Sequence, residues 1–154
     1  MIGMIVFGFA VAHPFLCTAT EVESIDIIDY GLYKTMFVEY QAAPHTARGK
    51  IQLVEKTELV QTTNRIPGKT GAEFGIRYIV NGSKKGEHVN VHVKVLHSET
   101  KNTNEWVISR QVGTPHFDGW KFNANSKIAP GKWTIQLFHD GTKLAEKRFN
   151  VYEL

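Results

Sequence analysis

The sequence predicts an all-β fold, a single antiparallel β-sandwich of about seven to nine strands. Three observations carry this prediction. Apolar and polar residues alternate along most of the chain, turn-forming pairs separate the alternating stretches, and no stretch carries the apolar stripe of a helix. The chain has 154 residues, 42% of them apolar, which suits one domain with one core.

The chain begins with an apolar stretch that resembles a secretory signal peptide. It carries no charged side chain and ends in small residues that place a cleavage site after Ala19. It is shorter than the ~20 apolar residues of a membrane span, and His13-Pro14 interrupts it. We therefore expect a signal peptide at 1–19 and a single exported domain at 20–154, periplasmic or secreted, with no integral membrane segment in the mature chain. A short anchor that is never removed is the alternative.

Period-two alternation marks the strands of the first half. Ile25 and Ile27 indicate a first strand, and residues 33–40 either continue it or form another. Residues 50–60 have the composition of a strand but mixed phase. Residues 74–80 place four apolar side chains on one face, as a strand with one buried face requires.

The clearest strand lies at 89–95. Four valines share one face and three polar residues share the other, so each valine buried adds about 1.5 kcal/mol of stabilisation before entropy is counted. A register shift of one residue would expose all of them. Residues 106–112 alternate in the same way, except that Arg110 breaks the pattern.

The end of the chain reads as a hairpin. A strand begins at 133–137, Asp140-Gly141 supplies the residues of a tight turn, and the chain returns through Phe149. Leu144 is out of phase with Phe149, which predicts a β-bulge. The polar stretch 97–105 before this hairpin predicts a loop.

The charge pattern argues against nucleic acid as a partner. The chain has 18 basic and 15 acidic side chains, a formal net charge of +3, and the basic residues are scattered. Proteins that bind nucleic acid concentrate lysine and arginine on one face or arm. We therefore expect an ordinary solvated surface.

Three segments together resemble the bacterial domain-of-unknown-function family DUF3859. They are Asp29-Tyr30-Gly31-x-Tyr33, the stretch from Thr62-Thr63 through Ile66-Pro67, Gly71 and Phe74-Gly75 to Arg77-Tyr78, and Pro130-Gly131-Lys132-Trp133 with the hairpin that follows. The resemblance implies an exported, immunoglobulin-like β-sandwich and carries over no activity, cofactor or catalytic residue. Within these motifs, Gly75 predicts a bulge or a close backbone approach, and the Trp133 indole is expected between the sheets.

The sequence carries no catalytic signature. It lacks a G-x-S-x-G elbow and a His-Glu-x-x-His motif, and its one cysteine leaves with the predicted leader. Asp26, Asp29, Asp118 and Asp140 are expected at strand ends and turns, where aspartate commonly bonds local backbone. We expect no enzyme; a hydrolase that combines dispersed carboxylates is one alternative.

Metal binding is the other alternative. His88 and His92 have the spacing of two ligands on a helix, but on a strand they lie roughly 13 Å apart. A site would need histidines from neighbouring strands. We therefore expect no metal site and no cofactor, and we keep a metal-binding envelope protein as an alternative.

Recognition through aromatic side chains is the remaining function. The segment 114–120 is turn-rich and holds Phe117 and Trp120, and Trp106 begins the strand before it. Loops on a rigid sandwich commonly bind ligands, and exposed tryptophan stacks on sugars or anchors a protein. We predict a non-enzymatic binding module at or beyond the cell envelope with a protein or glycan partner. The structural alternative is that Phe117 and Trp120 cover the open end of the core.

Overall fold

The computed structural model describes residues 19–125 and 127–154, so nearly all of the predicted signal peptide lies outside the described residues. The described part forms nine strands and contains no helix long and apolar enough to cross a membrane. The strands are β1 (Val22–Ala42), β2 (Lys50–Gln61), β3 (Arg65–Pro67), β4 (Glu73–Gly82), β5 (His88–His97), β6 (Thr103–Gln111), β7 (Pro115–Lys121), β8 (Gly131–His139) and β9 (Thr142–Tyr152).

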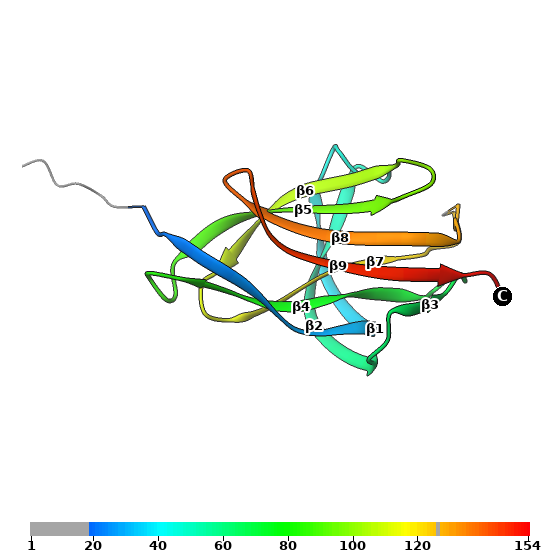
Figure 1. Cartoon of the computed structure of the whole chain (residues 1–154), viewed down its shortest axis with the longest axis horizontal. Coiled ribbons are helices and arrows are strands. Elements are labelled where there is room, and N and C mark those ends of the chain that lie inside the picture. The colour runs from blue at the N-terminus through cyan, green and yellow to red at the C-terminus, as the bar shows by residue number, and fades with distance from the viewer. Residues whose placement is uncertain (1–18, 126) are drawn as a thin grey trace, which may run out of the picture.

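The strands form two stacked sheets, which confirms the predicted sandwich (Figure 1). One sheet has the order β2-β1-β4-β7 and the other the order β3-β9-β8-β5-β6. All neighbouring strands pair antiparallel except β3, which adds to β9 in parallel. The short β3 lies in the middle motif of the family resemblance, at residues for which the sequence predicted no strand.

The core lies between the two sheets. The four valines of β5 are buried, as their alternation predicted. Aromatic rings from both sheets meet beside them: the Phe74 ring lies 5.1 Å from that of Phe149 and 6.1 Å from that of Trp133, centroid to centroid. Trp133 is buried, so its indole fills the space between the sheets as expected.

The β8–β9 hairpin has the predicted turn and the predicted bulge. Asp140 and Gly141 both adopt positive φ, 46° and 78°, which is the geometry of a two-residue turn matching strand twist. Leu137 pairs with Ala145 and Phe138 with Lys143, so Leu144 is the extra residue.

β1 is one continuous strand of 21 residues, although the sequence left one strand or two open. Its first half, through Leu32, pairs with β4, and residues 33–42 pair only with β2. This far part of the β1–β2 hairpin, residues 33–61, is called the arm below. In Figure 1 the arm runs across the direction of the other strands.

Segment 114–120 differs from the expectation. Its sequence predicts turns, but residues 115–121 form β7, the edge strand beside β4. Pro115 is tolerated because it begins an edge strand, and Gly119 lies directly opposite Gly75 of β4. A Cβ on Gly75 would lie 2.5 Å from the Asp118 carbonyl oxygen, which confirms the close backbone approach expected there.

Candidate functional site

The arm closes one side of the sandwich by binding to the edge strand β6. The backbone N–H of Glu105 donates to the His45 carbonyl oxygen at 2.9 Å, and the Ala47 N–H donates to the Asn104 side-chain oxygen at 2.7 Å. At the tip of the arm, residues 43–49, the Arg48 guanidinium also donates to the Lys121 carbonyl oxygen of β7 at 2.6 Å. The tip therefore connects the edges of both sheets.

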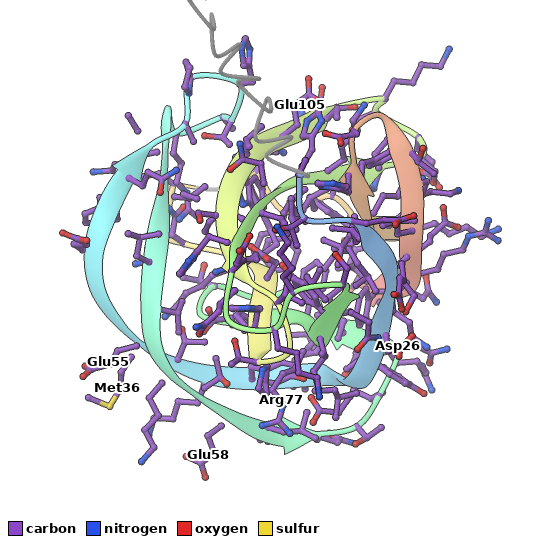
Figure 2. All side chains as sticks on the ribbon, turned by 90° about the vertical axis from the view of Figure 1, so that its left-hand side faces the viewer. Asp26, Met36, Glu55, Glu58, Arg77 and Glu105 are labelled. Carbon is purple, nitrogen blue, oxygen red and sulfur yellow. The ribbon has the colours of Figure 1, made fainter. Side chains whose placement is uncertain are left out.

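The outer face of the arm is directed at solvent. Figure 2 shows Met36, Glu55 and Glu58 pointing away from the sandwich, and all three are exposed. The inner face, in contrast, contributes Ile51 and Leu53 to the edge of the core. The arm is thus an amphipathic two-stranded hairpin whose inner face is directed at β6 and β7.

The three aromatic residues predicted as a binding site lie together under the inner face of the arm. Trp106, Phe117 and Trp120 all line one cavity of about 70 Å³, called the inner cavity below. Phe117 and Trp120 are half-buried, whereas Trp106 is 7% exposed. Trp106 is buried because it lies in phase with the inward-facing Asn104 and Ile108 of β6.

Phe117 is held by the glycine pair of β4 and β7. An added Cβ on Gly75 would lie 2.6 Å from the Phe117 ring, and one on Gly119 would lie 2.7 Å from it. The ring also packs on Tyr33, with centroids 4.7 Å apart. Both glycines are therefore required for the ring to lie flat against the sheet.

Trp120 separates the inner cavity from a larger pocket. Its ring stacks on the Trp133 ring at 6.4 Å between centroids, and the Arg48 guanidinium lies 5.5 Å from the Trp120 centroid. Arg48 and Trp120 line both spaces. These two residues form the boundary of a two-part site.

The larger space, called the outer pocket below, has a volume of about 670 Å³, which is typical of ligand pockets. Its lining combines tryptophan, amide and basic side chains with few aliphatic ones. The lining residues are Ala47, Arg48, His97, Thr100, Asn102, Thr103, Asn104, Trp120, Asn123, Asn125, Lys127, Ala129 and Trp133.

His97 supports the outer pocket from below. Its Nδ1 accepts a hydrogen bond from the Thr100 N–H at 3.1 Å, and its Nε2 donates to the Pro130 carbonyl oxygen at 2.8 Å. Its ring also packs on the edge of Trp133, 5.1 Å between centroids. Because both nitrogens are occupied, His97 acts as a structural support of the loop.

A closed polar cluster lies next to the inner cavity. Arg110 points inward and donates to the Asp118 carboxylate at 2.7 Å and to the Tyr78 hydroxyl at 3.1 Å, and that hydroxyl donates to Asp118 at 2.6 Å. Burial and the Asp118 charge raise the pKa of Tyr78. Burial opposes the Arg110 charge, but the Asp118 carboxylate more than compensates and raises the pKa of Arg110. The cluster therefore remains an ion pair with a neutral phenol.

Asp29 forms a second cluster on the outer face of its sheet. It accepts hydrogen bonds from the Tyr33 hydroxyl and the Arg77 guanidinium. Burial and the Asp29 carboxylate raise the pKa of Tyr33. The expectation that Asp29 and Asp118 lie at strand ends and bond local backbone is therefore wrong, because both lie within strands and bind arginine.

Two carboxylates line the inner cavity, the arrangement that a hydrolase would need. Glu73 accepts hydrogen bonds from the Thr35 hydroxyl at 2.7 and 2.8 Å, and burial raises the pKa of Glu73. Asp118 is held by Arg110 and Tyr78. Both carboxylates thus already have neighbouring hydrogen-bond donors.

Within the described residues, no three His, Cys, Asp or Glu side chains come together as a metal site. His92 of β5 lies beside Glu105 of β6, with Nε2 and the carboxylate oxygen 3.0 Å apart. This is a cross-strand pair on the outer face of the sheet.

Sequence reasoning missed Arg48 and the asparagines of the outer pocket. Arg48 reaches the site because the arm folds back over residues more than seventy positions later in the chain. No local pattern reports such a contact. The one available signal was Arg110, whose break in the alternation marked a polar cluster beside the site.

Comparison with known proteins gives the fold and the family. A crystal structure of an immunoglobulin-like protein from Pseudomonas aeruginosa superposes with a TM-score of 0.54 at 18% sequence identity, covering 89% of this chain and 99% of that one. No curated protein matches the chain. The family described as a domain of unknown function, DUF3859, matches residues 21–151, which confirms the resemblance inferred from the sequence motifs. The chain is a member of the DUF3859 family with an immunoglobulin-like β-sandwich fold.

Proposed function

We propose that this protein is a non-enzymatic saccharide-binding module that is exported to the periplasm or beyond. The observation that carries the proposal is the outer pocket of about 670 Å³, in which the Trp120–Trp133 pair lies among amide side chains. The apolar leader supports export.

The chemistry of the lining favours a sugar over a peptide. Sugars present apolar C–H faces, which pack on indole rings, and hydroxyl groups, which hydrogen-bond to amides. Four asparagines line the pocket, and the only aliphatic side chains in it are Ala47 and Ala129. A pocket that recognised apolar peptide side chains would offer larger aliphatic groups.

The pocket is held by a rigid frame. Trp133 is buried in the core and packs on Phe122 at 5.5 Å and Phe74 at 6.1 Å between centroids. Asn104 is buried and fixed by its bond to Ala47. A preorganised pocket loses little conformational entropy when a ligand binds, which supports binding as the role of the site.

The test measures binding of the full mature domain to a panel of neutral and acidic oligosaccharides, with tryptophan fluorescence and calorimetry as the two readouts. We expect at least one sugar to bind and to change the fluorescence. Trp120→Ala should weaken that binding at least about tenfold, since tryptophan anchors carry large shares of binding energy. The matched control is Tyr152→Ala, an aromatic that also lies under an arginine but outside the pocket.

Thermal unfolding of each variant separates lost binding from lost folding. Asn102→Ala offers a second, exposed position in the lining and should weaken binding without changing the unfolding midpoint. Absence of any saccharide binding, or sugar binding that neither variant changes, would reject the proposal. Specific binding of peptides instead would assign the pocket to a protein partner.

A further inference from the structure

The charged residues of the outer pocket are all basic. Arg48 and Lys127 line it, and it has no aspartate or glutamate in its lining. The inner cavity adds Lys50 and Lys121. Its two acids, Glu73 and Asp118, already accept hydrogen bonds from Thr35 and from Arg110 and Tyr78, as described above. The two-part site therefore has an excess of positive charge.

Arg48 is the cation at the centre of this excess. It is half-buried, it lines both the pocket and the cavity, and it lies over the Trp120 ring. Burial lowers the pKa of Arg48, so its charge is held at a cost. In the described part of the chain no carboxylate lies within ion-pair distance of it, and one donor is used on the Lys121 carbonyl oxygen. An anion beside the guanidinium would offset that cost.

Trp106 supplies a second, independent observation. Its side chain is 7% exposed and lines the inner cavity, and its indole N–H finds no acceptor among residues 19–125 and 127–154. A buried donor without an acceptor is destabilising, and the cavity of about 70 Å³ has room for an acceptor atom. Trp106 and Arg48 both line this cavity.

We propose that the ligand of this site is an acidic saccharide, whose anionic group binds Arg48 where the outer pocket meets the inner cavity. The inference rests on the proposed saccharide-binding function. The sugar rings occupy the outer pocket, and the anionic group pairs with the guanidinium fork. An oxygen atom of the ligand accepts the Trp106 N–H.

The test compares a short oligogalacturonate with the same oligosaccharide after methyl esterification, which neutralises its carboxylates and keeps its sugar rings. Calorimetry on the mature domain should show the acidic form bound at least about tenfold more tightly, because charge-assisted hydrogen bonds are the strong ones. The preference should shrink as salt rises.

Three variants assign the preference to Arg48. Arg48→Gln should remove the preference, so that the acidic and the esterified probe bind with equal affinity, and Arg48→Lys should restore part of it, since lysine keeps the charge but loses the fork. Arg65→Gln is the matched control because Arg65 also lies over an aromatic ring, that of Tyr152, outside the site. It should leave the preference intact.

The outcomes distinguish this inference from the function on which it rests. Equal affinity for the two probes, or an unchanged preference in Arg48→Gln, overturns the acidic-ligand proposal and leaves saccharide binding standing. Binding of neither probe by wild-type protein, together with no binding of any sugar in the panel, overturns both. Arg48-dependent binding of an oligoglutamate peptide without sugar binding also overturns both.

Discussion

Two arginines near the same cavity have opposite surroundings. Arg110 donates to the Tyr78 hydroxyl, the Asp118 carboxylate and a backbone carbonyl oxygen, and 15% of its side chain is exposed. Arg48 donates to a single backbone carbonyl oxygen and lies over Trp120. The first arginine has its counter-charge within the fold; the second has none among the described residues.

The difference teaches where to look for function in a sandwich without catalytic motifs. A buried charge with a complete set of partners stabilises one arrangement of the chain and leaves nothing to offer a ligand. A half-buried charge without an anion keeps its binding capacity. Both residues are arginines beside the inner cavity. The difference between their roles therefore comes from their hydrogen-bond and charge partners.

The largest expected effect comes from breaking the cluster of Arg110, Asp118 and Tyr78. Arg110→Met leaves the buried Asp118 carboxylate without its counter-ion and should lower the free energy of unfolding by about 3–5 kcal/mol. Arg48→Met should change it by less than about 1 kcal/mol. Urea unfolding followed by circular dichroism measures both; equal losses would show that the two arginines do not differ in role.

A smaller effect concerns the glycine pair beneath Phe117. Gly119→Ala places a Cβ 2.3 Å from the Phe74 carbonyl oxygen, which forces β7 away from β4 and should cost about 1–3 kcal/mol. Gly49→Ala at the arm tip meets no atom within 4 Å, and only its positive φ opposes the change. The ratio of the two losses, from the same unfolding experiment, tests whether close approach governs β7.

His116, next to Arg110, should make the stability of the domain sensitive to acid. Burial lowers its pKa below the ordinary 6.5. As pH falls through about 6.5, the unfolded chain therefore takes up a proton at this histidine before the folded chain does. The contribution of His116 to stability is full above about pH 6.5 and decreases below it. His116→Gln keeps a donor to the Gln111 carbonyl oxygen and should flatten the decrease. A series of urea titrations across pH would refute this if both proteins had the same slope.

Glu73 should give the smallest effect, with the opposite sign. Burial raises its pKa above the ordinary 4.5, so the folded chain holds the proton to higher pH than the unfolded one. Its contribution is full below the unfolded pKa and is lost as pH rises through the folded one. Glu73→Gln should therefore be more stable than wild type near neutral pH, with the advantage disappearing in acid. Thermal midpoints of the pair at matched pH measure it.

The parts of the fold that the sequence predicted are those set by neighbouring residues. The valine face of β5, the Asp140-Gly141 turn and the bulge at Leu144 each follow from spacing within one or two strands. β7 could not be predicted in this way because Pro115 and Gly119 read as turn residues. Only the facing Gly75 of β4 makes Gly119 suitable for a strand.

The candidate site shows the same division between local and long-range signals. The three aromatic residues come from neighbouring stretches of sequence, and they do line one cavity. The proposed binding chemistry, however, uses Arg48, which the arm delivers from far away in the chain, and Trp133, which the sequence assigned to the core alone. Side chains brought together by long-range pairing leave no local signal.

The continuity of β1 has a consequence for how this domain can be redesigned. Because one strand is both part of a sheet and part of the arm, the strand registers bring the tip at residues 43–49 to β6 and β7, where its own hydrogen bonds hold it. Residues at the tip can then be exchanged while the sandwich keeps its order of strands. On the proposed function, grafted tips therefore offer a direct way to redesign which ligand the domain binds.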